Sequence, residues 1–300
     1  MTIRLGIIGL SDGNGHPYSW AAIFNGYNAE AMENCGYPVI PRYLEKQSWP
    51  YCSISNAIVT SVWTQDVELS RHIARSSRIP KVCQSVEEMI STVDGVLLAR
   101  DDCENHWRFA EPVLNSGKPI YIDKPIAVSL AGLNRLYDLE QYPGQIFTGS
   151  ALRFSKELKL TPEELDSLGE IKHVIASTPK SWAKYAVHII EPVLNLLPKD
   201  DKPAGYSTGP PLRTNSCGGC LSVIWESGVK TSFFAMGDAL TPLSIRIHGT
   251  GGYKELTFTD SFTAFKATLE VFIEGIVDGT VASPKLFNTQ VVTLLEKGHV

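Results

Sequence analysis

Residues 3–15, IRLGIIGLSDGNG, decide the fold. Their apolar run ends just before Gly9 and has the character of a short buried strand. A helix is predicted over residues 17–27, so a glycine-rich loop connects a strand to a helix. In that context glycine lets the backbone approach a phosphate closely, and the helix start presents unpaired N–H groups. The apolar residues of the strand are Ile3, Leu5, Ile7 and Ile8.

The loop departs from the dinucleotide-binding pattern GxGxxG. Counted from Gly9, the second and third glycine positions are occupied by Ser11 and Asn14. The loop still predicts binding of a dinucleotide pyrophosphate, and the alternative is a plain glycine-rich turn. The loop residues expected to contact the cofactor are Gly9, Ser11, Gly13, Asn14 and Gly15.

Further strands and helices alternate through the first half of the chain. Capping boxes at Ser85 with Glu88 and at Asp101 with Glu104 mark two helix starts. Helices between strands favour a parallel, doubly wound sheet, because a parallel crossover needs that length. The predicted strands after the first are 57–63, 93–99, 119–122 and 145–148.

The pattern changes near Ser150, which divides the chain into predicted domains 1–150 and 151–300. Thr161, Pro162, Glu164 and Gly169 outline a capped helix. Period-two strands over 221–225, 229–234, 244–248 and 255–259 then predict an antiparallel sheet. Apolar residues from Phe262 to Ile276 predict a long helix covering that sheet, and Pro192 predicts a helix kink or start. The fold class is therefore α/β, with a Rossmann domain followed by an α+β domain whose open sheet is mainly antiparallel.

Composition excludes several classes of protein. The chain has 300 residues, 43% of them hydrophobic, which is enough for two cores and too apolar for a disordered chain. Its net charge of −5, without a basic stripe, argues against a nucleic-acid partner. No apolar run suggests a membrane span or a signal peptide, so we expect a cytoplasmic protein. Of the six cysteines only Cys217 and Cys220 have a ligand-like spacing, and no second pair completes a metal site.

Residues 26–53 are longer than a doubly wound unit needs between its first helix and second strand. Such an insertion is either functional and lid-like or a surface excursion. In the second case it would be packed by its aromatic residues Tyr37, Tyr43, Trp49 and Tyr51.

Residues 98–125, LARDDCENHWRFAEPVLNSGKPIYIDKP, supply His106, then Gly117-Lys118, then Asp123-Lys124-Pro125. In this order and spacing the stretch resembles the Gfo/Idh/MocA oxidoreductases, the family of glucose-fructose oxidoreductase and inositol dehydrogenase. The resemblance continues over nearly the whole chain and implies a Rossmann domain followed by an open-sheet domain. The later matching segments are 152–154, 168–171, 188–191, 247–252 and 272–298.

The resemblance implies the site residues and the cofactor, NAD or NADP. Lys124 is expected between cofactor and substrate, where an ammonium stabilises a developing alkoxide, and His188 is expected to be the acid or base. Arg153, Lys184 and Tyr185 are expected to contact the substrate; a surface arginine is the alternative for Arg153. The second strand ends at residues 63–66, where Asp66 lies late for binding ribose, so NAD versus NADP stays open. The expected cofactor contacts outside the loop are Thr64, Asp101, His106 and Asp123.

One position departs from the family. Four residues before this histidine the family commonly carries Asp, and this chain has Lys184. Two ammonium groups, of Lys184 and Lys124, would keep His188 neutral at pH 7, and an anionic substrate would supply the missing charge. The alternative is that Lys184 points into solvent.

The predicted function is hydride transfer between a nicotinamide cofactor and a sugar, sugar acid or nucleotide-sugar hydroxyl or carbonyl. The alternative is a family member that binds a nucleotide or sugar without oxidising it. We expect a small-molecule partner, a carbohydrate that can be anionic, and a homodimer or homotetramer.

Overall fold

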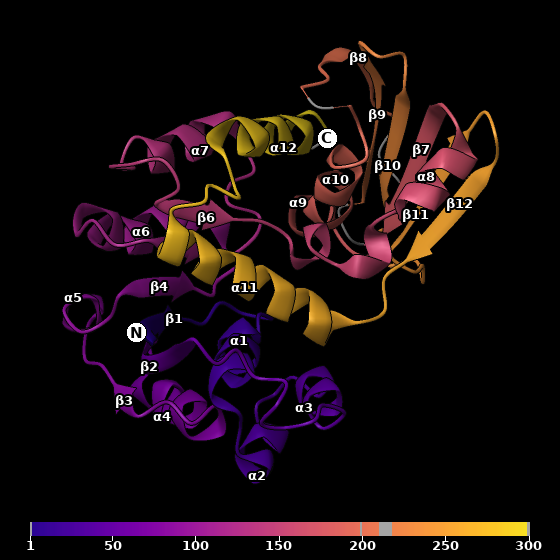
Figure 1. Cartoon of the computed structure of the whole chain (residues 1–300). Helices are drawn as coiled ribbons and strands as arrows, with labels where there is room; N and C mark the ends of the chain where they lie inside the picture. Colours follow the sequence, from indigo (N-terminus) through magenta and orange to yellow (C-terminus); the bar gives the residue numbers. More distant parts are fainter. Residues whose placement is uncertain (1, 199, 210–217, 299–300) are drawn as a thin grey trace. The chain divides into compact units, whose positions relative to one another are not determined.

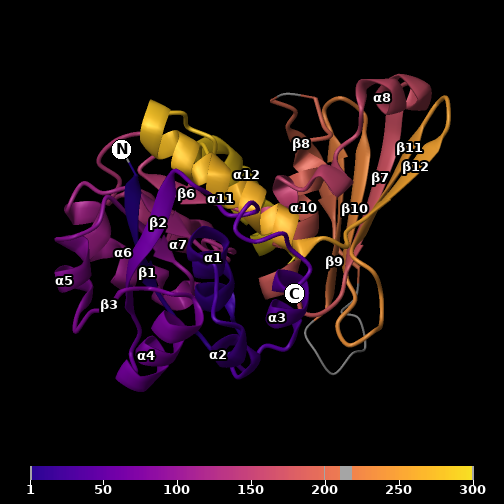
Figure 2. The same cartoon turned by 60° about the horizontal axis from the view of Figure 1, so that its bottom comes forward.

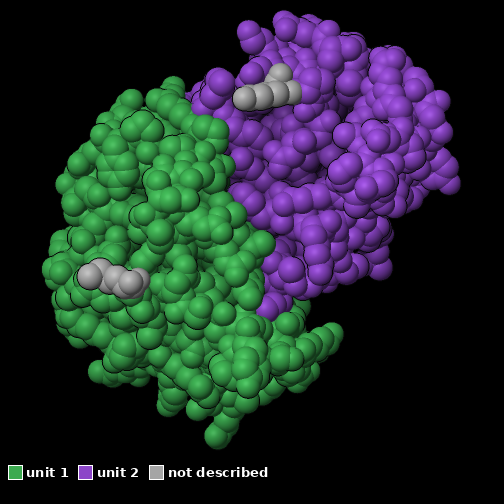
Figure 3. Space-filling model, in the orientation of Figure 1, with its two compact units in different colours: residues 1–127, 131–148, 265–285 green, residues 128–130, 149–264, 286–300 purple. Residues whose placement is uncertain are grey.

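The computed structural model describes residues 2–198, 200–209 and 218–298, which form two compact units. Unit 1 contains Met1–Ala127, Ala131–Thr148 and Phe265–Lys285. Unit 2 contains Val128–Leu130, Gly149–Ala264 and Leu286–Val300. Figure 3 colours the two units separately.

Unit 1 is built on a six-stranded parallel sheet of order β3-β2-β1-β4-β5-β6 (Figure 1). This is the Rossmann order, with its topological switch point between β1 and β4. The order confirms the predicted doubly wound sheet. The strands are β1 (Ile3–Ile8), β2 (Ala57–Trp63), β3 (Lys81–Val82), β4 (Gly95–Leu98), β5 (Ile120–Ile122) and β6 (Ile146–Thr148).

The helices of unit 1 cover both faces of this sheet. On one face Trp20 of α1 stacks on Tyr121 of β5 at 4.5 Å, and Tyr121 meets Phe272 of α11. On the other face Met89 of α5 approaches Gly6 so closely that a Cβ there would clash. The helices are α1 (His16–Asn25), α2 (Ala29–Glu33), α3 (Val39–Leu44), α4 (Val67–Ser76), α5 (Val86–Ile90), η1 (Cys103–Asn105), α6 (His106–Asn115), α7 (Leu130–Tyr137) and α11 (Ser261–Asp278), the last two shared with unit 2.

Unit 2 contains a mixed sheet of order β12-β11-β7-β10-β9-β8 (Figure 2). Among the described strands of this sheet only β7 and β10 pair in parallel, so the prediction of a mainly antiparallel sheet is confirmed. The strands are β7 (Ile171–Thr178), β8 (Pro203–Ser207), β9 (Gly219–Trp225), β10 (Lys230–Ala235), β11 (Ser244–Gly249) and β12 (Tyr253–Thr257).

The helices of unit 2 follow the capping signals in part. Thr161 and Glu164 form the predicted reciprocal capping box of α8. The prediction for Pro192 of a kink or helix start is wrong about the start, because α10 begins five residues earlier and continues through Pro192. The helices are η2 (Ala151–Arg153), η3 (Lys156–Leu158), α8 (Pro162–Leu168), α9 (Trp182–Tyr185), α10 (Val187–Leu194) and α12 (Lys285–Gly298), the last beginning in unit 1.

Two other expectations are wrong. From Phe265 on, α11 belongs to unit 1, where Phe272 packs on the parallel sheet, so it does not cover the antiparallel sheet as predicted. Asp101 does not cap a helix with Glu104, because its carboxylate accepts the Ser11 hydroxyl and α6 begins only at His106. Among the described helices, none is both long and apolar enough to cross a membrane.

Candidate functional site

The glycine loop lies at the carboxyl end of β1, at the switch point of the parallel sheet. Gly9 must be glycine, since a Cβ there would lie 2.4 Å from Cγ of Pro17. Gly13 has a φ of +77°, a conformation that only glycine adopts without strain, and it faces open space. Ser11 and Asn14, which replace the other two glycines of the pattern, are buried and hydrogen-bonded within unit 1.

The Asp123 carboxylate connects the segment that contains Lys124 to the glycine loop and to the start of α1. Its Oδ2 accepts from Nδ2 of Asn14 at 2.8 Å and lies 2.5 Å from Nδ1 of His16, while Oδ1 accepts the Lys124 backbone N–H. Burial alone raises the pKa of this carboxyl, but the charges of His16 and Lys124 and the Asn14 hydrogen bond outweigh it and lower the pKa. Asp123 is therefore a buried carboxylate that fixes the loop.

Asp101 and Arg100 tie the end of β4 to the same loop. Oγ of Ser11 donates to Oδ1 of Asp101 at 2.8 Å and accepts the Asp101 backbone N–H at 3.0 Å. The buried Arg100 guanidinium donates to the Leu10 carbonyl and to Oε1 of Gln65, and it pairs with Asp102. The loop is therefore held by hydrogen bonds that involve side chains, which the glycines of a GxGxxG loop could not make.

The carboxylate that follows β2, that of Asp66, caps the next helix. Asp66 is the N-cap of α4 and accepts the backbone N–H groups of Glu68 and Leu69. Thr64 is buried and bonds to Ser70 and to the Asp66 carbonyl.

His106, an expected cofactor contact, is completely buried. Its Nε2 lies 2.7 Å from the Arg100 carbonyl and its Nδ1 lies 3.1 Å from the Ile126 carbonyl. In this arrangement the ring joins the ends of two strands of the sheet.

The insertion borders the loop. A Cβ at Gly15 would meet Tyr37 and Ile40 at less than 3 Å, so these residues pack directly on the loop. Burial raises the pKa of Tyr37, and the nearby Asp12 and Asp101 carboxylates add to the rise. Tyr43 reaches Ser19, and Trp49 packs on Tyr27, as expected for an aromatic excursion. Tyr51 is 89% exposed and takes no part in this packing.

These residues fit a dinucleotide pyrophosphate in part. Within the described chain, the backbone N–H groups of Ser11, Asp12 and Gly13 donate no hydrogen bond, and α1 starts at the end of the loop. His16 is bonded through Nδ1 and is 19% exposed, and no described residue bonds its Nε2. Backbone donors, a helix start and an imidazole can all hold an anion. Ser11 and Asn14 carry side chains where the glycine pattern has none. They leave a pyrophosphate less room to approach the loop backbone.

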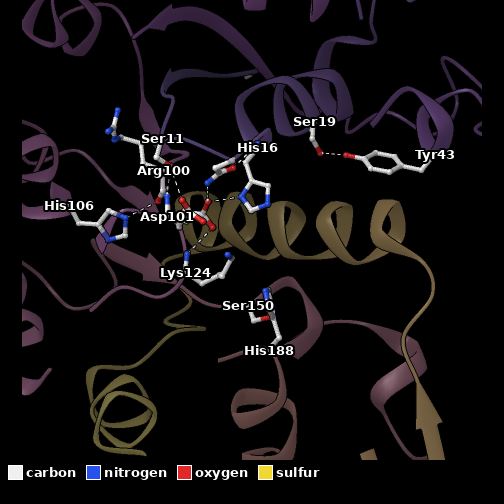
Figure 4. Close-up of polar contacts among 12 residues, drawn as sticks. Ser11, His16, Ser19, Tyr43, Arg100, Asp101, His106, Lys124, Ser150 and His188 are labelled. Carbon is white, nitrogen blue, oxygen red and sulfur yellow. Dashed lines mark hydrogen bonds and ion pairs between the residues drawn. The ribbon is translucent and has the colours of Figure 1, made fainter. Parts of the chain in front are cut away.

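His188 lies in the first turn of α10, in unit 2. Its Nδ1 is 2.7 Å from Oγ of Ser150, the contact drawn in Figure 4. The Tyr185 ring meets it edge to face at 5.3 Å, and Tyr185 accepts a hydrogen bond from Lys180. Lys184 is exposed at the end of α9. A second lysine, Lys180, is thus connected to the His188 ring through Tyr185, which contacts both.

Arg153 is placed among aromatic residues of unit 2. Its guanidinium lies 3.9 Å from the centre of the Phe287 ring, and its charge acts on the buried Glu191 carboxyl. It also lines a cavity of about 770 Å³. The described lining of this cavity includes none of the other expected substrate contacts of unit 2, namely Lys184, Tyr185 and His188.

Sequence reasoning missed five residues that organise these sites. Their contacts with the loop, with one another and with Asp123 and His188 join positions 35 to 107 apart along the chain, and no local pattern signals them. Only the segment His188-Ile-Ile-Glu191 contains a local signal, since residues three apart share a helix face and Glu191 is therefore expected near His188. The five residues are His16, Gln65, Arg100, Ser150 and Glu191.

The structure does not test the ligand-like spacing of Cys217 and Cys220, because Cys217 lies outside the described residues.

Residues 34–149 match the sequence profile of the Gfo/Idh/MocA oxidoreductase family, described as having an NAD-binding Rossmann fold. This match confirms the predicted resemblance and the cofactor class. The glycine loop lies before the matched residues. None of the curated proteins compared with the chain matches it.

Solved structures share the fold over nearly the full length. A probable dehydrogenase from Thermotoga maritima has a TM-score of 0.74 and 14% identity, covering 98% of this chain and 94% of that one. Myo-inositol dehydrogenase from Lactobacillus casei, in complex with NAD(H) and myo-inositol, has 0.73 and 16%, covering 99% and 94%. UDP-N-acetylglucosamine 3-dehydrogenase from Acidithiobacillus ferrooxidans has 0.72 and 15%, covering 99% and 97%.

Proposed function

We propose that the protein is an NAD(P)-dependent oxidoreductase acting on a hydroxyl or carbonyl of a sugar, sugar acid or nucleotide sugar. The observation that carries the proposal is the family match of residues 34–149, which includes the Asp123-Lys124-Pro125 motif bonded to the glycine loop. The sugar substrate class is supported by the names of the structural neighbours, an inositol and a nucleotide-sugar dehydrogenase among them.

The chain's own residues would handle the proton and the developing charge. The bound dinucleotide supplies the hydride acceptor or donor. The Lys124 ammonium hydrogen-bonds the substrate oxygen and stabilises it as its negative charge develops. His188 removes the hydroxyl proton in the oxidative direction and returns it in the reductive one.

The cofactor is held, in this proposal, by the backbone N–H groups of Ser11 to Gly13 and by Nε2 of His16. Asp123 also binds Asn14 of the loop and the Lys124 N–H, so replacing His16 should remove one cofactor contact and leave the loop conformation in place. We expect His16→Ala to weaken NAD(H) or NADP(H) binding about tenfold, which is one lost charge-assisted hydrogen bond.

The charge around His188 favours an anionic substrate. Lys184 is exposed and Lys180 bonds to Tyr185, so two ammonium groups belong to the segment that precedes His188. A uronate or a nucleotide-sugar phosphate would offset these charges, whereas a neutral polyol would not.

Oxidation of a panel of inositols, hexoses, uronates and nucleotide sugars, followed by the absorbance of the reduced nicotinamide, tests the activity. Turnover that is lost in Lys124→Met and in His188→Gln supports the assigned roles. Cofactor binding without turnover of any panel member would favour the alternative, a family member that binds without oxidising.

The open sheet face of unit 2 supports self-association. Ile224 on β9 and Tyr253 on β12 are 50% and 72% exposed, and the strand registers place them in one row across the sheet. We expect sedimentation to give a dimer or tetramer that Ile224→Glu weakens.

A further inference from the structure

Unit 2 contains a buried carboxyl group that the proposed mechanism does not use. Glu191 lies in α10 one turn after His188, and only 3% of it is exposed. A buried carboxyl group costs stability unless its oxygens are hydrogen-bonded. The partners of Glu191 therefore indicate what it does.

Both carboxyl oxygens of Glu191 meet the same backbone group. The Ser150 N–H lies 3.1 Å from Oε1 and 3.0 Å from Oε2. The preceding residue is Gly149, where a Cβ would lie 2.9 Å from Oε2. Glycine at this position thus lets the carboxyl group approach the backbone of Ser150.

Ser150 carries this restraint to the imidazole. Its Oγ lies 2.7 Å from Nδ1 of His188 and accepts the Leu152 backbone N–H at 3.2 Å. The serine is completely buried, so its hydroxyl has little freedom to move. The carboxyl group fixes the serine backbone, and the serine hydroxyl then fixes the ring.

We propose that Glu191 and Ser150 are positioning residues for His188, in place of the carboxylate that is absent at position 184. A hydroxyl can donate to an unprotonated Nδ1 or accept from a protonated one, so Ser150 remains a partner in both states of the ring. The inference rests on the proposed role of His188 as the acid–base group.

Ring signals of His188 in the full chain test the proposal without cofactor or substrate. Long-range ¹H–¹⁵N spectra report the tautomer and the titration of each histidine, and His188→Gln identifies the signal. Ser150→Ala should change the tautomer populations of His188 and move its titration midpoint by about half a pH unit or more, a factor of about three in the proton equilibrium. Glu191→Leu should produce the same type of change, since it releases the Ser150 backbone.

Two conservative variants separate positioning from folding. Ser150→Thr keeps the hydroxyl and Glu191→Gln keeps a carbonyl oxygen for the Ser150 N–H, so both should leave the His188 signals near those of the wild type. Ser155→Ala is the matched control, because Ser155 is also buried and its Oγ accepts the N–H two residues on at 3.2 Å, within unit 2. It should leave the His188 signals unchanged.

Unchanged His188 signals in Ser150→Ala would overturn the proposal, as would equal changes in Ser155→Ala. Either result would leave the proposed oxidoreductase activity standing. Conversely, a protein that turns over no substrate but shows the expected signals would contradict the activity and keep the positioning.

Discussion

Two imidazoles, one in each unit, are held in different ways. Nδ1 of His16 faces the buried carboxylate of Asp123 at 2.5 Å, and Nδ1 of His188 faces the hydroxyl of Ser150 at 2.7 Å. A carboxylate only accepts, so His16 must keep its proton on Nδ1 to retain the contact. A hydroxyl donates or accepts, so His188 retains its partner whether or not Nδ1 is protonated. The comparison supports the proposed roles, a fixed ring geometry for His16 and proton transfer for His188.

The largest expected effect is the loss of the carboxylate in unit 1. Asp123→Ala leaves His16, Asn14 and the Lys124 N–H without their common acceptor, so it should lower the free energy of unfolding by about 3–5 kcal/mol. Ser150→Ala removes a neutral partner and should cost only about 1 kcal/mol. Urea unfolding measures both values. Equal losses in the two variants would break the comparison.

Glu191 should make the stability of the protein depend on pH. Burial raises its pKa from the ordinary 4.5 to about 7, against the opposing effects of the Arg153 charge and the Ser150 N–H; His188 lies one turn before it. Between these two pH values the folded state holds a proton that the unfolded chain has lost, so raising the pH lowers the free energy of unfolding. The shift corresponds to about 3 kcal/mol.

Glu191→Gln should remove this dependence, since an amide does not titrate in this range. Unfolding curves of both proteins between pH 4.5 and 7.5 measure it. A wild type that gains stability with rising pH relative to Glu191→Gln would contradict the assigned protonation of Glu191.

A pair of glycine variants tests whether the glycine loop before His16 contacts the cofactor, apart from any effect of backbone strain. Gly13 and Gly36 have φ values of +77° and +83°, and both face open space, so alanine should cost about 1–2 kcal/mol of backbone strain at either position. Only Gly13→Ala should also weaken dinucleotide binding, by about tenfold. Equal affinity in the two variants would show that the loop does not contact the cofactor.

The smallest effect is expected near His188. Lys184 is exposed, so an ion pair with an anionic substrate should contribute at most about 1 kcal/mol, or about fivefold in affinity. Binding of glucose and glucuronate to the wild type and to Lys184→Ala measures it, with Lys172→Ala, on the exposed surface of β7, as the control. An anion preference that survives Lys184→Ala unchanged would rule out the contribution of this lysine.

The local elements of the fold follow from the sequence, because short-range signals determine them. The strand predicted at 57–63 is β2 with the same bounds, and the capping box of Thr161 forms as expected. The last strand was predicted at 255–259 and is observed as Tyr253–Thr257. β3 was missed because two residues carry no periodicity, and β7 because its outward side chains His173 and Ile175 are half-buried and break the alternation.

The features that the sequence did not predict depend on long-range contacts. An apolar stripe predicts the helix α11 but not which sheet it covers, and Phe272 selects the parallel sheet. Asp101 has the local pattern of a helix cap, but its carboxylate accepts a hydrogen bond from Ser11, 90 positions away, instead. No local pattern indicates a role for His16, because its partner Asp123 lies 107 positions away. The family resemblance predicts Lys124 and His188 as site residues, but it does not predict the side chains that contact them.

Calorimetric titration of the full chain with NAD(H) and NADP(H) tests the central claim most directly. The account predicts binding of at least one of them with a micromolar dissociation constant, weakened about tenfold in His16→Ala. The absence of heat with either cofactor, oxidised or reduced, in a folded wild-type protein would contradict it.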